Sequence, residues 1–452
     1  MEKDSFRNMC VAALAVALAE CAPRTGNVRV PAESYVDRQS HALVTQEVAT
    51  HAPAPSTVAS APRDVTLDDV VALVRERDLG VASARLETQA LAAEMRQALA
   101  RPNPHLEMTA ENIGGSGSFG GIDQSESTLL LAQRLELGGK RRRRGAVAAS
   151  ALAGEAERVR LRESAAVAAA GEAFFELLGA QASYALAEET AARAAEVVRE
   201  IERRRTAGAA SAADVERARL FTTRAASEAS QRDAQIMLAR QRLAASWGED
   251  GSAVGRARGT LDPLPALPQL AALESRIAAS PPMATARAQA ARARAELELE
   301  RAGAVPDVTL GGGVRYLEGP GDVAFVLETA MELPFFDRRS GAISAAELRA
   351  ARAEREHEAA RLSTRDAVMR GYLQMRVAAE QVRLLETRHL PIARDAVAQS
   401  QRGYGDGTAT SFDLFDAQRA LLELRLQRID ALVDYHRAAM AVEGVLAPQV
   451  VR

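Results

Sequence analysis

Residues 402–418 read RGYGDGTATSFDLFDAQ, and residues 208–215 read GAASAADV. The two stretches share a glycine and an aspartate at the same spacing, because Gly208 and Asp214 recur 199 positions later as Gly407 and Asp413. Further residues recur at offsets between 196 and 202 positions: Ala84 as Ala286, Pro104 as Pro306, Glu136 as Glu332, Gly145 as Gly341 and Ala218 as Ala417. The sequence therefore predicts an internal duplication, in which each half reads helix, strand pair, long helix, short loop and long helix.

The predicted strands show period-two alternation of apolar and polar residues, most clearly in the second half. The apolar positions are Leu129, Leu131, Leu135 and Leu137 in the first half, and Val308, Leu310, Val314, Tyr316, Val323, Phe325, Leu327 and Met331 in the second. Segments of about 10 residues with one apolar face suit tilted strands that cross a membrane. An amphipathic hairpin packed on a soluble core fits the same alternation.

Long amphipathic helices are predicted after each strand pair. From Gly145 to about Arg205, and again from Ser211 to Trp247, alanine, leucine and valine recur at spacings of three and four with charged residues between them. The first segment alone would extend about 90 Å as a helix. Helices of this length cannot bury their apolar stripes singly, so the pattern predicts coiled-coil partners.

The composition excludes several functional classes. The 452 residues include 57 basic and 60 acidic side chains and only 4% aromatics. The net charge is therefore −3, and the chain has no overall positive electrostatic field that would attract nucleic acid. The only cysteines, Cys10 and Cys21, lie near the N-terminus, and the six histidines show no ligand spacing. No nucleophile with a matching base can be assembled from the motifs. We therefore expect no enzyme activity, no bound metal and no cofactor.

Residues 1–19 have the features of a signal peptide, with a short apolar run from Val11 to Ala19 after two basic residues. Three interpretations of this segment are considered: cleavage after Ala19, acylation of Cys21 within a lipoprotein box, and an apolar helix start that has no role in export. No other stretch reaches the ~18 apolar residues of a membrane-spanning helix. Any membrane crossing would therefore have to use strands.

The remaining chain divides by composition and repeat pattern. Residues 20–64 are predicted to be an extended or disordered lead-in, 65–254 the first repeat, 255–268 a linker, 269–447 the second repeat and 448–452 a tail. The first repeat begins with Thr66 and Asp69, which have the spacing of a helix cap. That helix is predicted to continue to about Ala100.

Two strand pairs give four strands per chain, which is too few to close a barrel. Each unpaired backbone group in hydrocarbon costs several kcal/mol, so a sheet in a membrane must close on itself. Several copies of the chain would have to complete one barrel together. The predicted fold class is mainly α, with a long coiled-coil tunnel and a membrane β-barrel completed by an oligomer.

Residues 402–418 closely resemble the periplasmic tip of the TolC family, and residues 208–215 resemble its sister tip. Together with the duplication, the likeness covers nearly everything from Val65 to Ala447. The resemblance implies a homotrimer in the outer membrane of a Gram-negative bacterium, with a 12-stranded barrel in lipid and a periplasmic helical tunnel. It also implies a periplasmic adaptor and an inner-membrane pump, which open an iris at the tip.

The resemblance assigns a pore aperture to Asp413 and Asp416. Three copies of each would form two carboxylate rings one helical turn apart, which would favour cations. The alternative is that these aspartates cap or solvate the start of a helix, where aspartate is favoured.

Other tip residues also match the family pattern. Tyr404 and Asp214 match a tyrosine and an aspartate whose hydrogen bond holds the family's iris closed. The surrounding tip, predicted to contact the adaptor, contains Gly208, Ser211, Gly407 and Thr410.

Two further stretches resemble the branch of this family that serves cobalt, zinc and cadmium efflux pumps. They read LELGGKR at residues 135–141 and LPFFDRR at residues 333–339, and they lie where strand is predicted to change into helix. The junction residues singled out are Gly138, Gly139, Lys140, Pro334 and Asp337. Glycine and proline would supply the bend. The basic run at 140–144 would either meet lipid headgroups or form a solvated face.

The predicted function is the exit duct of a tripartite efflux pump, and the predicted cargo is heavy-metal cations. A multidrug or type I secretion duct on the same fold is an alternative, because the pump rather than the duct usually selects cargo. A coiled-coil scaffold or adhesin without a channel is a third reading, although it leaves the duplicated strand pairs without a purpose.

Overall fold

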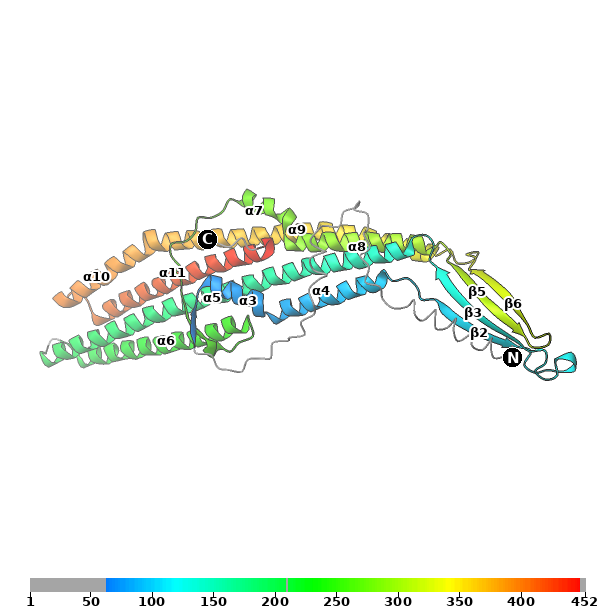
Figure 1. Cartoon of the computed structure of the whole chain (residues 1–452). Helices are drawn as coiled ribbons and strands as arrows, with labels where there is room; N and C mark the ends of the chain where they lie inside the picture. Colours follow the sequence, from blue (N-terminus) through cyan, green and yellow to red (C-terminus); the bar gives the residue numbers. More distant parts are fainter. Residues whose placement is uncertain (1–61, 209, 448–452) are drawn as a thin grey trace. The chain divides into compact units, whose positions relative to one another are not determined.

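The structure, a computed structural model, describes residues 62–208 and 210–447 (Figure 1). The predicted signal peptide, Cys21, almost all of the lead-in and the tail at 448–452 lie outside the described residues. The described part is predominantly helical with a few strands, as predicted.

Within the described residues four helices exceed 30 residues, and the longest of these, α5, has 67 residues and extends about 100 Å. In chain order the elements of three residues or more are β1 (Arg63–Val65), α3 (Leu67–Arg77), α4 (Leu79–Ala98), β2 (His105–Glu111), η1 (Gly117–Phe119), β3 (Glu126–Leu135), α5 (Lys140–Thr206), α6 (Ala212–Ala245), η2 (Gly251–Ala253), β4 (Val254–Ala257), α7 (Leu270–Arg276), η3 (Ile277–Ala279), α8 (Pro281–Gly303), β5 (Val308–Leu317), β6 (Asp322–Met331), α9 (Ser340–Leu384), η4 (Leu385–His389), α10 (Leu390–Asp406) and α11 (Ser411–Leu446).

The two predicted strand pairs form one antiparallel sheet in the order β2-β3-β5-β6. The two hairpins are joined because β3 pairs with β5, with Leu129 opposite Val314. Val314 in turn lies opposite Phe325 on β6, so the apolar residues that alternate in the sequence gather on one face of the sheet. That face is open: Phe325 is 92% exposed and Leu327 is 85% exposed.

A second, two-stranded parallel sheet was not predicted. It pairs β1 with β4, and Arg63 lies opposite Val254. Asp64 strengthens the pairing, because its carboxylate accepts hydrogen bonds of 2.9 Å from the amide of Arg256 and from the side chain of Arg258. Ordered structure therefore begins inside the range assigned to the lead-in and continues into the range assigned to the linker.

The first helix follows the predicted cap but not the predicted length. Thr66 and Asp69 form a capping box at the start of α3, as predicted. The helix is then interrupted at Asp78, whose ψ of 121° is not helical. The Asp78 carboxylate accepts a 2.7 Å hydrogen bond from the amide of Val81 and so starts α4 as a separate helix. The prediction of one continuous helix to about Ala100 is wrong at this point.

A π-helical turn, η4, separates α9 from α10. Pro391, at the start of α10, has no N–H to donate and would crowd the carbonyl one turn earlier, which explains why the helix widens there. Arg428 of α11 binds the turn through a 2.8 Å hydrogen bond from Nε to Glu386, and it also pairs with Asp262.

The helices pack side by side in two sets that share α5 (Figure 1). Next to the sheet the order is α4-α5-α8-α9, and toward the helical tips it is α6-α5-α11-α10. The largest buried cluster lies where α3, α5, α6 and α11 meet, around Phe174, Leu177, Trp247 and Leu432. One edge of the layer is therefore made by α4 and α6, and the other by α9 and α10.

Candidate functional site

Two helical hairpins end in short turns, one between α5 and α6 and one between α10 and α11. Each turn contains a glycine in the left-handed region, since Gly208 and Gly407 both have φ of 76°. Gly407 ends α10 by donating its N–H to the carbonyl of Gly403. The two glycines shared by the matched stretches thus occupy equivalent backbone positions.

The residues after each turn form equivalent helix caps. Ser211 and Asp214 form a capping box at the start of α6, and Thr410 and Asp413 form one at the start of α11. The Asp413 carboxylate accepts hydrogen bonds of 2.7 and 2.8 Å from the hydroxyl and the amide of Thr410, which lower its pKa. Asp413 therefore serves as a cap within the chain.

The proposed aperture residues are both exposed on the first turns of α11. Unlike Asp413, Asp416 makes no hydrogen bond or ion pair within residues 62–208 and 210–447. The formation of carboxylate rings by these residues stays a prediction.

The two tips are joined by Asp214 and Ser411. The buried Ser411 hydroxyl donates a 2.7 Å hydrogen bond to Oδ1 of Asp214, while Oδ2 of Asp214 binds Ser211. Hydrogen bonds from Ser211 and Ser411 lower the pKa of Asp214. The predicted partner of Asp214, Tyr404, makes no hydrogen bond to it in the described part of the chain, so the clasp between these two residues stays a prediction.

Tyr404 contacts Arg204 of the opposite tip instead. The Arg204 guanidinium lies 4.9 Å from the centre of the Tyr404 ring, and its Nη1 donates a 3.0 Å hydrogen bond to the Tyr404 carbonyl oxygen. Burial raises the pKa of Tyr404, although the charge of Arg204 acts in the opposite direction. Arg204 and Ser411 were missed by sequence reasoning, because nothing in their local pattern indicates a partner about 200 residues away.

An apolar cluster lies beneath these polar contacts. The rings of Phe221 and Phe415 stack at 4.8 Å, and Ile201 and Val215 are buried against them. Residues from both hairpins contribute to this cluster. The tips are therefore held together by a small core as well as by hydrogen bonds.

The first strand-to-helix junction contains the predicted glycine bend. Gly138 and Gly139 have φ of 67° and 71°, and Lys140 is the first residue of α5. A Cβ atom at Gly138 would lie 2.9 Å from Cβ of Val305, so only glycine fits there without movement. The neck between strand and helix is therefore tightly packed.

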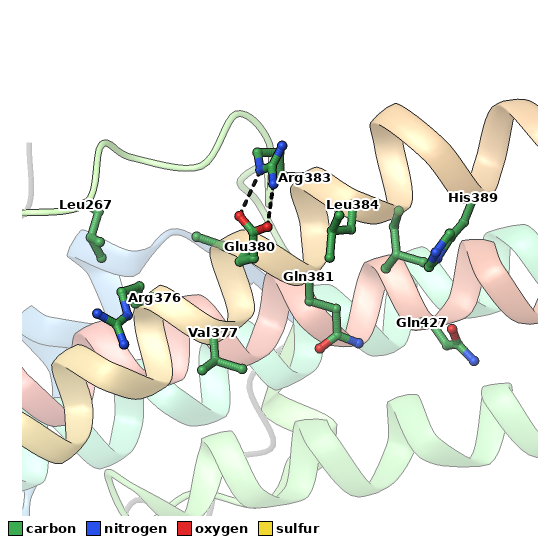
Figure 2. A pocket seen from close by; sticks show the side chains of 11 residues that line it. Leu267, Arg376, Val377, Glu380, Gln381, Arg383, Leu384, His389 and Gln427 are labelled. Atoms are coloured by element: carbon green, nitrogen blue, oxygen red, sulfur yellow. Dashed lines mark hydrogen bonds and ion pairs between the residues drawn. The ribbon is translucent and has the colours of Figure 1, made fainter.

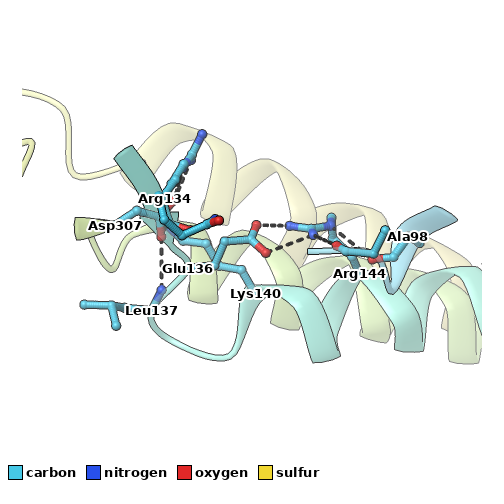
Figure 3. Close-up of polar contacts among 9 residues, drawn as sticks. Ala98, Arg134, Glu136, Leu137, Lys140, Arg144 and Asp307 are labelled. Carbon is cyan, nitrogen blue, oxygen red and sulfur yellow. Dashed lines mark hydrogen bonds and ion pairs between the residues drawn. The ribbon is translucent and has the colours of Figure 1, made fainter. Parts of the chain in front are cut away.

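Asp307, just before β5, organises this junction (Figure 3). Its carboxylate accepts hydrogen bonds of 2.6 Å from Lys140 and 2.5 Å from Arg134, and a third of 3.1 Å from the amide of Leu137. Burial alone would raise the pKa of Asp307, but these donors hold it below its ordinary value. The sequence did not indicate Asp307, whose donors lie about 170 residues earlier in the chain.

A second ion pair extends the junction to α4. Glu136 pairs with Arg144, which also donates to the carbonyls of Ala98 and Ala100 (Figure 3). Hydrogen bonding to Arg144 lowers the pKa of Glu136. Because Arg143 pairs with Glu298 as well, most of the basic run at 140–144 is engaged inside the chain, which neither prediction for this run anticipated.

The second junction lies between β6 and α9 and contains Pro334 and Asp337. The Asp337 carboxylate accepts a 2.8 Å hydrogen bond from the amide of Arg339, which has φ of 57°. The Arg339 side chain reaches Glu300 of α8 at 2.7 Å. The turn into α9 is thus fixed to the preceding helix.

The described residues contain no group of three or more histidine, cysteine, aspartate or glutamate side chains placed to hold a metal ion. Among the helices built from those residues, none combines the length and the apolar character that a membrane crossing requires.

Comparison with known proteins identifies the family. Residues 70–249 and 272–447 match the family described as outer membrane efflux protein, and the chain belongs to this family. It is 30% identical over 391 residues to the cobalt-zinc-cadmium resistance protein CzcC of Cupriavidus metallidurans, a match that covers 84% of this chain and 90% of that protein. It is 29% identical to the nickel-cobalt-cadmium resistance protein NccC of Alcaligenes xylosoxydans xylosoxydans, over 67% of each chain.

The fold is similar to that of solved outer-membrane channels. The structure of CusC matches with a TM-score of 0.72 and 17% identity, over 85% of this chain and 92% of that one. The predicted resemblance to TolC-like efflux channels, with homology to heavy-metal resistance proteins, is therefore confirmed. The protein is an outer-membrane efflux protein.

Proposed function

We propose that the chain is the exit-duct subunit of a tripartite efflux pump that exports heavy-metal cations together with a periplasmic adaptor and an inner-membrane pump. The names of two relatives, which are cobalt-zinc-cadmium and nickel-cobalt-cadmium resistance proteins, support this cargo. The duct itself acts as a passage and performs no chemistry on the cargo.

The observation that carries the proposal is the open apolar face of the four-stranded sheet. Phe325, Leu327 and Met108 are all at least 75% exposed on this face, which would be costly in water but is stable against lipid. The other face carries polar side chains, among them Arg315 paired with Glu126. This division matches a sheet that separates lipid from an aqueous lumen.

Three copies would complete a 12-stranded barrel. Strands β2 and β6 each pair on one side only among the described strands, so each copy has one free edge at either end of its sheet. Joining β6 of one copy to β2 of the next would satisfy both edges and close the sheet. The same head-to-tail ring would gather the helices into a periplasmic tunnel.

An internal duplication explains the element order. The first repeat, 65–254, contains α4, β2, β3, α5 and α6, and the second, 269–447, contains α8, β5, β6, then α9 with α10, and α11. The matched glycine turns and capping boxes at the two tips support this origin. On this proposal the tips form the aperture and contact the adaptor.

The test is conductance of the purified protein in a planar bilayer, with its oligomeric mass measured in the same detergent. We expect a trimer that passes a cation-selective current, and cells lacking the protein should become sensitive to cobalt, zinc or cadmium. A monomer without conductance would refute the duct. A conducting trimer whose loss sensitises cells only to drugs would refute the metal cargo and favour the multidrug duct.

A further inference from the structure

An open groove lies on the α9 edge of the helical layer, beside the π-helical turn (Figure 2). Its volume is about 750 Å³, and its walls include Leu267, Val377, Leu384, His389 and Gln427. Glu380 and Arg383 form an ion pair at its rim. The groove combines apolar side chains with charged and polar ones, which is typical of a surface that another protein covers.

Val377, one of the apolar side chains at this groove, points away from the rest of the chain. Val377 is 63% exposed, whereas Met375, two residues earlier, is 2% exposed. Residues two apart on a helix lie on nearly opposite faces, at about 100° per residue. Since Met375 packs toward α11, Val377 faces outward at the edge.

The opposite edge of the layer carries a matching apolar side chain on α6. Leu238 is 71% exposed, whereas Ile236, two residues earlier, is buried in the main core. Leu238 therefore faces away from α5, at the free edge of the layer. One edge thus presents a groove and the other presents a protruding leucine.

The groove and Leu238 lie at about the same distance from the helical tips. At about 1.5 Å per residue, Leu238 lies about 40 Å from the Ser211 turn, and Leu384 and Val377 lie about 35 and 45 Å from the Gly407 turn. The two turns are level with each other, because Ser411 binds Asp214. In a closed ring, copies of the chain are related by rotation alone. The groove and Leu238 therefore keep the same distances from the helical tips in every copy.

We propose that the groove of one copy receives Leu238 of the next copy, and that this contact sets the register between the helices of neighbouring subunits. The inference rests on the proposed ring and adds the residues that join its helical wall. A second copy of the chain is the partner that fits the groove. Rotation within the ring places Leu238 of the neighbouring copy at the same distance from the tips as the groove.

Cysteine cross-linking tests this contact. A chain carrying Leu238→Cys and Leu384→Cys should form covalent trimers in membranes under mild oxidation, because each copy supplies one partner to each neighbour. The matched control carries Leu220→Cys and Leu384→Cys. Leu220 is exposed and follows the buried Ala218 by two residues, so it lies on the same face of α6 as Leu238 but about 27 Å nearer the tip. We expect about tenfold less cross-linked chain from the control, and none beyond background from either single variant.

The outcomes separate this contact from the proposed function. Equal cross-linking in the control pair, or no cross-linking in a Leu238→Cys and Leu384→Cys protein that is still trimeric and conducting, would overturn the contact and leave the duct intact. A protein without trimers or conductance in its unmodified form would instead refute the proposed function. A Leu238→Cys and Val377→Cys pair gives a second measurement of the same contact and should behave like the first.

Discussion

The Ser411 hydroxyl donates a 2.7 Å hydrogen bond to Oδ1 of Asp214, across the two helical tips. Asp214 simultaneously caps α6 through its second oxygen, so one carboxylate serves both the local helix and the contact between hairpins. Opening an aperture by moving α10 and α11 away from α5 and α6 would have to break this bond. It would also break the contact between Arg204 and Tyr404.

Replacing Ser411 should increase resting leak. Ser411→Ala removes a hydrogen bond to a charged group, which contributes about 2 kcal/mol, while the Thr410 cap of α11 remains. We expect a higher open probability in bilayer recordings and greater antibiotic sensitivity in cells. Ser227→Ala, at an exposed serine of α6, is the control. Leak equal to that of the control would show that this bond does not hold the tip closed.

Acidification should loosen the tip. Hydrogen bonds hold the pKa of Asp214 below its ordinary value of about 3.9, so the carboxylate stabilises the folded tip at neutral pH. That contribution is complete above the unfolded pKa and is lost as the pH falls through the lower folded pKa. We expect a constant open probability between pH 7 and 5 and a rise below about pH 4. Recordings on Asp214→Asn should lack this step; its persistence would assign the step to another group.

Neutralising Asp416 should reduce cation preference. Its carboxylate is exposed and unpaired among the described residues, so Asp416→Asn removes a charge at little structural cost. Reversal potentials in a salt gradient should move toward those of an unselective pore. Asp395→Asn, at an exposed aspartate of α10, is the control. Unchanged cation selectivity would refute the hypothesis that Asp416 forms a carboxylate ring in the pore.

Replacing Asp307 should destabilise the neck between sheet and helices. Asp307→Asn leaves Lys140 and Arg134 without a charged partner, and we expect a loss of about 2 kcal/mol in the free energy of unfolding. Glu298→Gln breaks exposed pairs with Arg143 and Arg301 at the same neck and should cost less than about 1 kcal/mol. Denaturant titration in detergent measures both. Equal losses would mean that Asp307 has no special role.

The two junction glycines should differ in their tolerance of alanine. Both have positive φ, which costs a residue with a side chain about 1–2 kcal/mol. A Cβ at Gly138 would also press on Val305, whereas at Gly139 the nearest atom, on Arg142, lies at 3.7 Å. Thermal unfolding should therefore show a larger loss for Gly138→Ala than for Gly139→Ala. The reverse order would mean that Val305 moves aside without cost.

The strand pairs, the long helices and the tip turns can all be predicted from the amino-acid sequence alone. Period-two alternation around Leu129 and Phe325, glycine at 208 and 407, and the cap pattern at Thr66 are local signals, and each depends only on residues close in the chain. The family resemblance could also be recognised at this level, because the tip motifs are contiguous.

Contacts between residues far apart in the chain become visible only in the folded structure. Asp307 with Lys140, Ser411 with Asp214, and Arg63 beside Val254 each join segments more than 160 residues apart, and no local period encodes such pairs. The breaks at Asp78 and before Pro391 also follow from competition between helix continuation and capping or packing, which a periodic pattern does not reveal. Side-chain type and spacing specify the elements, whereas the packing of helices and strands selects their partners.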